Sequence, residues 1–480
     1  MKLSPRNWAS FAISTILPVF LIVLAVAPAF LAADETTDKV DKLFAAWDKT
    51  TTPGAALAVI KDGKIIYERG YGMAKLEDGI VNTPDKVFDI GSVSKQFTAT
   101  CVAMLIREGK IGLDDDIRKY IPEMPAYEKP ITVNHLLHHT SGLRDYNALL
   151  SLAGFRPESD SPTVEESLEV IRRQKKLNYT PGEEYSYTNT GFFLLSQIVE
   201  RVSGKSLNAF AQERIFKPLG MTKTLFQDDH TQIIKDRATG YSRGDKGFAI
   251  SMSNWDETGD GNVYTTVRDL YLWDQAFYTN VLGKDLMDML HTQGVLNSGK
   301  KIDYAFGLVV SDYKGLKVVE HGGSWVGFRA ALVRFPEQKF SVVILANLDS
   351  IDPSGLAFKV ADIYLAGLIK EPAKEETKKE AKAAPVKAMS AAELGVYAGT
   401  YVSEELLDTR YVISVDKDTL VLKTRDVARA PLKAMAPDKF TQPDYGLNIE
   451  FVRERGGKGA KVTGFTVSVG RAAGIVFVKR

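Results

Sequence analysis

The chain has 480 residues, and its 61 Lys and Arg side chains nearly balance its 60 Asp and Glu side chains. This length predicts two or three domains, and the hydrophobic content of 45% is typical of a folded globular protein. The balanced charge argues against a nucleic-acid partner, because phosphate binding requires a basic excess. The single cysteine, Cys101, excludes an internal disulfide and a Cys-based zinc site.

The N-terminal segment has the pattern of a secretory signal. Lys2 and Arg6 precede a long apolar run, which ends in small alanines before two acidic residues. A charged start, an apolar middle and a small-residue end are typical of a cleaved signal peptide. We therefore expect residues 1–33 to be removed and the mature protein to be secreted or periplasmic. The alternative is an uncleaved membrane anchor over residues 8–33, with the protein facing outside the cytoplasm.

Residues 371–388 divide the chain. Almost every residue in this segment is Lys, Glu, Ala or Pro. Such a composition cannot bury a core, so it predicts a charged, solvated linker. We expect a large domain over residues 34–370 and a small domain over residues 389–480.

The large domain begins and ends with strand-like runs. A helix is expected near residues 39–47, and the Asp-Gly pair at positions 62 and 63 predicts a hairpin. Periodicity predicts strands over residues 55–60, 64–70, 304–310, 316–320, 327–334 and 340–346, and helices over residues 96–107, 192–202 and 356–369. This order predicts an α+β fold, with an antiparallel sheet from both chain ends flanked by helices and a helical subdomain.

The small domain is predicted to be all-β. Its short apolar runs are separated by Gly, Asp or Lys turns and cover residues 411–415, 419–423, 447–452, 462–469 and 474–478. Short strands at this spacing predict a small antiparallel barrel or sandwich.

Ser92 is the strongest candidate nucleophile. Ser-x-x-Lys occurs four times, starting at Ser92, Ser298, Ser311 and Ser414. Only Ser92 follows a short apolar run and a glycine and opens an apolar-periodic helix, where free N–H groups and the helix dipole stabilise negative charge. Lys95 lies on the same helical face, and a desolvated lysine there can accept the serine proton. The alternative is a serine that only caps the helix beside a solvated lysine.

Tyr187 and Asn189 form a second candidate feature. A phenol can carry a proton in catalysis when nearby lysines lower its pKa, and the Asn189 amide can hold a lysine or a substrate amide. The same Tyr-Thr-Asn tripeptide recurs at residues 278–280, at the end of an amphipathic helix, where we interpret it as a helix end.

His321, Gly322, Gly323 and Ser324 lie between two strand-like runs. Two adjacent glycines allow a ligand backbone to approach closely. The Ser324 N–H would then supply an oxyanion donor beside that of Ser92. The alternative is a β-turn or bulge with an exposed histidine.

Three clustered histidines raise the question of a metal site. His135 has helical ligand spacing to His138 and His139, but the segment lacks the Glu of a His-Glu-x-x-His site. We therefore expect no metal and no other cofactor, and we expect a packed loop with a buried, hydrogen-bonding histidine.

Together these segments resemble the serine β-lactamase and penicillin-binding protein superfamily, and its class C-like branch most closely. The match is to segment order and context as well as to short patterns. The resembling segments are residues 88–97 for the nucleophile, 131–143 for a structural element, 181–191 for the Tyr-x-Asn motif, and 216–221 and 259–266 for later landmarks. Residues 321–323 stand where the family has Lys-Thr-Gly or His-x-Gly, and the resemblance covers about residues 38–369.

The resemblance implies a serine hydrolase. Ser92 would be the acylated nucleophile, Lys95 and Tyr187 would form the general-base network, and Asn189 would position Lys95 and the substrate. The N–H groups of Ser92 and Ser324 would form the oxyanion hole. The ester-linked acyl-enzyme would then be resolved by water or another acceptor.

His321 is a departure that bears on the substrate. A lysine there would hold a permanent positive charge for a substrate carboxylate, whereas histidine titrates near neutrality. Within the resembling branch, His-x-Gly is more similar to esterases and aminopeptidases than to efficient β-lactamases. We expect an ester, a D-amino-acid amide or peptide, or a peptidoglycan-related substrate. The alternatives are a β-lactamase or D-alanyl-D-alanine carboxypeptidase, and a penicillin-binding sensor that acylates with little turnover.

The tail from Leu394 onward is similar to the small β-barrel domains appended to D-aminopeptidase-like members. By analogy, the barrel would lean over the active site and limit the size of the substrate. A catalytically silent module with the barrel as its working part is a further alternative, although the candidate site residues argue against it.

Overall fold

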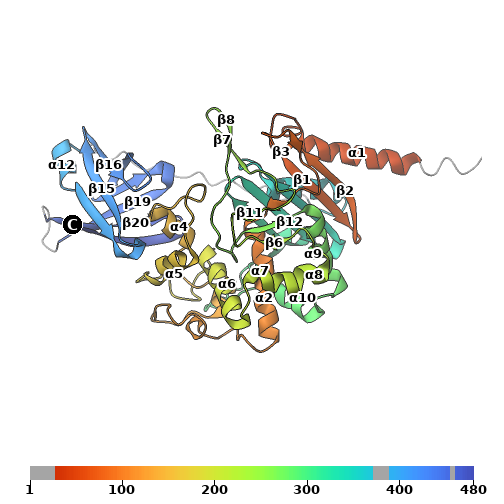
Figure 1. The fold of residues 1–480 in the computed structure, drawn as a ribbon, viewed down its shortest axis with the longest axis horizontal. Helices are drawn as coiled ribbons and strands as arrows, with labels where there is room; N and C mark the ends of the chain where they lie inside the picture. The colour runs from red at the N-terminus through yellow and green to blue at the C-terminus, as the bar shows by residue number, and fades with distance from the viewer. Residues whose placement is uncertain (1–26, 371–388, 455–459) are drawn as a thin grey trace, which may run out of the picture.

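The computed structural model describes residues 27–370, 389–454 and 460–480. An α+β body is followed by a closed all-β barrel that lies beside it, so the expected fold class is confirmed (Figure 1). The predicted linker and residues 1–26 of the predicted signal segment lie outside the described residues. In the described part of the chain, none of the helices combines the length and the apolar character needed to cross a membrane.

The central sheet of the body has the strand order β10-β11-β12-β13-β1-β2, and every neighbouring pair is antiparallel. Its strands come from both ends of the body, as expected. They are β1 (Ala55–Lys61), β2 (Lys64–Tyr71), β10 (Val309–Tyr313), β11 (Leu316–Trp325), β12 (Phe328–Phe335) and β13 (Phe340–Ala346). The two ends meet where β1 pairs with β13, with Ala55 opposite Ala346.

The sheet is covered by helices on both faces. Leu57 and Val59 of β1 lie in a core with α1 (Ala27–Phe44) and α11 (Pro353–Tyr364), whereas Ala58 lies in the other core, which includes α2 (Lys95–Arg107). Successive strand residues point to opposite faces, so a strand with two buried faces is a continuous apolar run. This explains why β1 and β13 show no polar alternation.

A helical subdomain packs around α2. The helices of this region are α3 (Val133–Leu137), α4 (Tyr146–Leu152), α5 (Val164–Arg172), α6 (Asn189–Ser203), α7 (Leu207–Ala211), α8 (Lys217–Leu219), α9 (Val267–Thr279) and α10 (Lys284–Leu290). Of these, α9 packs on β1 and β13 of the sheet. A small sheet of β5 (Phe88–Asp89), β9 (Val263–Thr265) and β6 (Leu225–Phe226) leads into α2. Gly204 ends α6 in the left-handed region, with φ 70°.

The strand expected over residues 304–310 is wrong over residues 304–308. β10 begins at Val309, and residues 304–308 form a turn in which Gly307 has φ 71°. A Cβ at Gly307 would lie 2.6 Å from the carbonyl oxygen of Lys95, so the turn packs closely against the start of α2. Apolar content suggested a strand, but this tertiary contact requires a glycine turn. The expected helix to residue 369 also ends earlier, at Tyr364.

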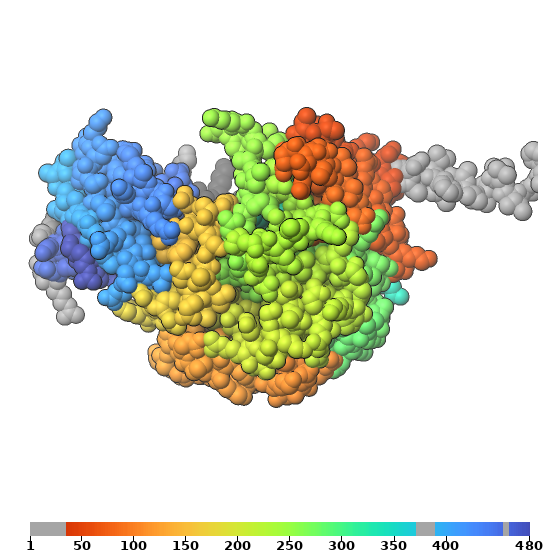
Figure 2. Space-filling view, in the orientation of Figure 1, coloured from red at the N-terminus to blue at the C-terminus, as the bar shows by residue number. Residues whose placement is uncertain are grey.

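The small domain is a closed barrel, which confirms the barrel over the sandwich. Its strands follow one another in chain order and are β14 (Gly399–Ser403), β15 (Thr409–Asp416), β16 (Thr419–Lys423), β17 (Ala430–Ala436), β18 (Lys439–Gln442), β19 (Leu447–Arg453), β20 (Val462–Val469) and β21 (Ala472–Lys479). Pairing of β14 with β21 closes the ring, and stacked aromatics such as Phe465 and Phe477 fill it. Figure 2 shows the barrel against the segment that carries α4 and α5.

Candidate active site

The turn that carries Ser92 lies where β11 crosses the start of α2. Ser92 sits in a short 3-10 turn (Gly91–Ser94) between β5 and α2. Gly91 has φ 48°, and a Cβ there would lie 2.7 Å from the Ser324 nitrogen. A Cβ at Gly323 would collide with the carbonyl oxygen of Ile90. Both glycines are therefore needed for β11 to pass so close, and this packing brings the Ser324 amide beside the turn that carries Ser92.

Lys95 is fully buried and its ammonium has three acceptors. Its Nζ lies 3.1 Å from Ser92 Oγ, 2.9 Å from Asn189 Oδ1 and 2.6 Å from the backbone oxygen of Asp260. The structure therefore brings the predicted pair together in the arrangement that the helical spacing indicated. Burial lowers the pKa of Lys95 to about 8, although the negative charges of Asp260 and Asp145 act to raise it.

The geometry around Lys95 orients a proton transfer. A protonated amine has three N–H donors, and all three acceptors are satisfied. When Lys95 loses a proton, it keeps two N–H groups for Asn189 Oδ1 and the Asp260 carbonyl, which can only accept. The lone pair then faces Ser92 Oγ, so the neutral amine can take the serine proton.

This arrangement predicts a pH dependence. The rate at which a neutral fluorophosphonate probe labels Ser92 is expected to rise about tenfold per pH unit and to level off above about pH 8, because only neutral Lys95 is a base. The measurement is the labelling rate from pH 5 to pH 10. Lys95→Arg, which stays charged throughout, is expected to be slow and flat. A wild-type rate independent of pH would contradict the role of Lys95.

Tyr187 lies over the site with its ring 5.0 Å from Lys95 Nζ. Burial raises the pKa of its phenol well above the usual value, and the nearby Ser92 hydroxyl opposes this only in part. The phenol pKa is therefore not lowered by nearby lysines, because desolvation outweighs the opposing effects of the Ser92 hydroxyl and of the Arg471 charge. Tyr187 stays protonated and can donate a proton, and its buried hydroxyl has no other well-aligned partner among the described residues.

His321 is buried and uncharged. Its Nδ1 lies 2.6 Å from the Gly322 oxygen, so Nδ1 carries the proton, and Nε2 accepts from the Tyr304 hydroxyl at 3.0 Å. Burial, together with the charge of Lys95, lowers the pKa of His321 to about 4. The exposed-histidine alternative is wrong, and this position supplies no fixed positive charge to the site.

Sequence reasoning missed two carboxylates that hold the site in place. Asp145 caps α4, and its Oδ2 accepts from the backbone N–H of Asn189 at 2.7 Å. The backbone oxygen of Asp260 accepts from Lys95, and its side chain accepts from the Tyr146 hydroxyl at 3.0 Å. Asp260 lies in the Gly-Asp-Gly part of a segment singled out above, but its contact to Lys95 has no local sequence signal.

A small acidic recess of about 40 Å³ opens beside Ser92. Glu257 and Asp260 line it together with Trp255, whose ring packs 5.5 Å from that of Trp325. Burial raises the pKa of Glu257 to about 7. Its Oε1 accepts from Ser167 Oγ, whereas Oε2 is buried with no partner among the described residues. The recess can therefore accept a small hydrogen-bond donor such as an ammonium group.

A second, larger cavity of about 730 Å³ also opens at Ser92. It is lined by all eight predicted site residues except Lys95, namely Ser92, Tyr187, Asn189, His321, Gly322, Gly323 and Ser324. Arg471, from the turn between β20 and β21 of the barrel, also lines it. The barrel therefore reaches the active-site cavity.

The histidine segment is a packed loop with buried, hydrogen-bonding histidines, as expected. His138 is held between the carbonyl oxygens of Asn134 and Thr292, each 3.0 Å from a ring nitrogen. His139 is buried beside Tyr187, with ring centroids 4.2 Å apart. Across the described ranges, no three His, Cys, Asp or Glu side chains gather as metal ligands would.

The family model described as Beta-lactamase matches residues 40–362. The chain therefore belongs to this family. The D-aminopeptidase of Brucella anthropi is 33% identical over 319 residues, which are 65% of this chain and 59% of that protein. Penicillin-binding protein 4* of Bacillus subtilis is 27% identical over 422 residues, which are 83% of this chain and 89% of that protein.

A solved structure extends the likeness to the barrel. The octameric penicillin-binding protein homologue from Pyrococcus abyssi matches with a TM-score of 0.61 at 24% identity, over 94% of this chain and 100% of that one. At this identity the match shows the fold alone. The chain spans about three-fifths of the length of the curated D-aminopeptidases that it matches.

Proposed function

We propose that the protein is a serine hydrolase that acts outside the cytoplasm on D-amino-acid amides and peptides through an acyl-enzyme at Ser92. The observation that carries this proposal is the buried Lys95, which forms a hydrogen bond with Ser92 and has a lowered pKa. A relative named D-aminopeptidase supports the substrate class. The signal-like pattern of residues 1–33 supports the location. Simple esters of the same acyl groups are further expected substrates.

The site geometry supports the following proposed reaction. Ser92 Oγ attacks the carbonyl carbon while neutral Lys95 takes its proton, and the N–H groups of Ser92 and Ser324 bind the oxyanion. The C–N bond then breaks, and the leaving amine takes a proton through Tyr187, which Lys95 reprotonates. A water molecule releases the acyl group from Ser92 by the reverse sequence of proton transfers.

The acidic recess supports a substrate with a free amino group. Glu257 and Asp260 lie on the recess wall, and Ser92 is part of the same wall. An acyl group attached to Ser92 can place an α-ammonium in this recess, on whose wall Glu257 has a carboxylate oxygen without a partner among the described residues. A buried carboxylate beside an ammonium forms a strong, charge-assisted hydrogen bond.

A substrate panel tests this function. Wild-type enzyme is expected to cleave D-alanine p-nitroanilide faster than its L-enantiomer. N-Acetylation is expected to lower kcat/KM about ten- to a hundredfold, because it removes the ammonium that pairs with Glu257. Glu257→Gln is expected to lose most of this preference while still cleaving the acetylated substrate. Asp256→Asn, a change at the neighbouring acid that does not line the recess, is the matched control.

Three outcomes would contradict the proposal. Absence of turnover with every amide and with p-nitrophenyl esters would exclude a hydrolase of this kind. Efficient turnover of a chromogenic cephalosporin alone would favour a β-lactamase. A single burst of product equal to the enzyme concentration, without steady-state turnover, would favour a penicillin-binding sensor.

A further inference from the structure

The barrel contributes a cation to the active-site cavity. Arg471 lies in the turn that joins β20 to β21, next to Gly470, which has φ 47°. Its guanidinium carbon is 4.7 Å from the centre of the Tyr187 ring, and Lys95 Nζ is 5.0 Å from the same centre. The two cations therefore lie within about 10 Å of each other, a range over which charges interact in salt solution. Arg471 accordingly opposes protonation of Lys95 and so helps to lower its pKa.

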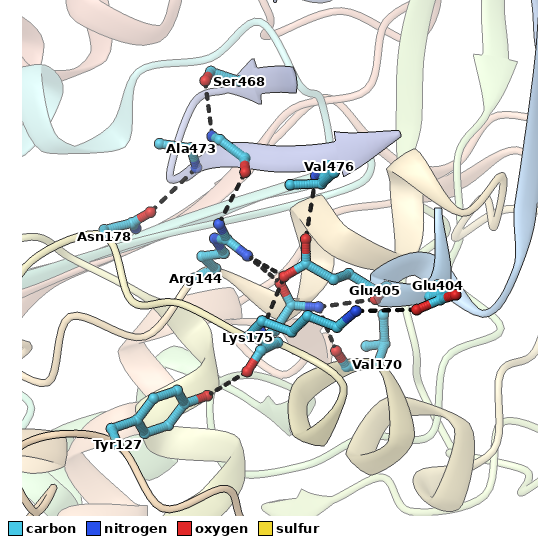
Figure 3. Close-up of polar contacts among 12 residues, drawn as sticks. Tyr127, Arg144, Val170, Lys175, Asn178, Glu404, Glu405, Ser468, Ala473 and Val476 are labelled. Atoms are coloured by element: carbon cyan, nitrogen blue, oxygen red, sulfur yellow. Dashed lines mark hydrogen bonds and ion pairs between the residues drawn. The ribbon is translucent and has the colours of Figure 1, made fainter. Parts of the chain in front are cut away.

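The backbone of this turn is fixed to the body. The Arg471 carbonyl accepts from the Asn178 side chain at 2.9 Å and from the Asp145 N–H at 3.3 Å. The Ala473 N–H donates to Asn178 Oδ1 at 3.1 Å (Figure 3). These bonds use only the backbone of Arg471. The Arg471 side chain is thus held at the cavity by backbone hydrogen bonds of its turn, and it takes no part in those hydrogen bonds itself.

The buried ion pair of Arg144 and Glu405 anchors the barrel behind the turn. Their side chains are 2.8 Å apart and only 2% and 4% exposed. Glu405 also accepts from the Val476 N–H of β21 (Figure 3). Arg144 donates to the Gly474 oxygen. Both contacts lie on the strand that follows Arg471. The position of Arg471 is therefore defined by buried contacts rather than by a surface loop.

The guanidinium of Arg471 keeps its donors for a ligand. It forms a long ion pair with Asp145, in which Nη1 and Oδ2 are 3.6 Å apart, and this carboxylate already accepts from the N–H groups of Asn189 and Ala148. Among the described residues, the Arg471 guanidinium forms no hydrogen bond of good geometry. Arg329 also lines the cavity, but it donates to the carbonyl oxygens of its own hairpin.

We propose that Arg471 of the barrel binds a free carboxylate of the substrate and so replaces the fixed charge that His321 does not provide. The inference rests on the proposed function and narrows its substrates to short peptides with a free C-terminus. An extended residue spans about 3.5 Å, so a carboxylate one to three residues beyond the scissile bond can reach Arg471 from Ser92. A guanidinium binds a carboxylate through two parallel N–H donors.

The test compares D-alanyl-glycine with D-alanyl-glycinamide, which differ only in the terminal charge. Full-length wild-type enzyme is expected to prefer the free acid at least tenfold in kcat/KM, chiefly through KM. Arg471→Gln is expected to lose this preference, and Arg471→Lys to keep part of it. Arg329→Gln, the same change in the same cavity, is expected to keep the wild-type ratio. Thermal unfolding of each variant shows whether the barrel remains docked.

A second measurement separates this inference from the proposed function. Benzylpenicillin carries a carboxylate that its methyl ester lacks, and both report acylation of Ser92 without peptide turnover. Selective slowing of benzylpenicillin acylation in Arg471→Gln would support the role of Arg471 even if neither peptide is cleaved. Equal effects on acid and neutral substrates, or none, would overturn the inference while leaving the hydrolase intact. Failure of every substrate and probe with the wild type would overturn both.

Discussion

Ser92→Ala is expected to lower kcat on D-alanine p-nitroanilide by about 10⁴- to 10⁶-fold, because the acyl-enzyme cannot form without the Ser92 oxygen. The oxyanion donors and the binding groups remain, so KM is expected to change little. Labelling by a fluorophosphonate or a fluorescent penicillin is expected to disappear. Steady-state kinetics and gel fluorescence of purified variants measure both effects.

The chain offers a matched control for this substitution. Ser298 begins another Ser-x-x-Lys pattern and lies in an exposed turn. Among the described residues, its hydroxyl accepts a hydrogen bond only from the nearby Lys300 N–H. Ser298→Ala is therefore expected to leave kcat and labelling at the wild-type level. Labelling that persists in Ser92→Ala, at an unchanged rate, would place the nucleophile elsewhere.

Glu405→Gln is expected to lower the free energy of unfolding of the docked structure by about 3–5 kcal/mol, because it leaves the buried Arg144 without its counter-charge. Three other groups depend on this carboxylate or its backbone, namely Lys175, Gln174 and Val476. Denaturant unfolding followed by tryptophan fluorescence measures the loss. In Glu405→Gln, the barrel is expected to unfold at a lower denaturant concentration than the body, because the ion pair joins the two.

Two comparisons make this prediction specific. Asp408→Asn removes an exposed partner of Arg173 at the same boundary and is expected to cost less than about 1 kcal/mol. The double variant Arg144→Met and Glu405→Leu replaces the pair with apolar side chains and is expected to regain most of the stability. If Glu405→Gln is as stable as the wild type, the pair does not hold the barrel in place. The preference of Glu405→Gln for peptides with a free C-terminal carboxylate is also expected to be smaller than that of the wild type, because Arg471 is held at the cavity by the docked barrel.

Much of the fold was predictable because local patterns carry it. The Asp-Gly turn defined the hairpin of β1 and β2, and the two buried apolar runs β1 and β13 indicated the sheet from both chain ends. In the barrel, β14, β17 and β18 were missed. The inward-facing residues of β17 are Ala430, Leu432, Ala434 and Ala436, so three of the four are small and the strand shows only a weak apolar period.

Within the site, the sequence by itself determined the pairing of Ser92 with Lys95. A spacing of three positions in a helical segment places the two side chains on the same face. The sequence also identified Tyr187, Asn189 and the segment from His321 to Ser324 through their likeness to a family. The direction of the Tyr187 pKa shift could not be predicted, because it depends on how much water the folded chain removes from the phenol.

Only the tertiary structure decided which charges surround this pair. Asp145, Asp260 and Arg471 come from three distant segments, and their contacts depend on how the body packs and how the barrel docks. No periodicity or short motif encodes such contacts, because their partners are set by long-range burial. The sequence showed that His321 lacks a permanent charge, whereas the fold showed that the barrel places Arg471 in the same cavity.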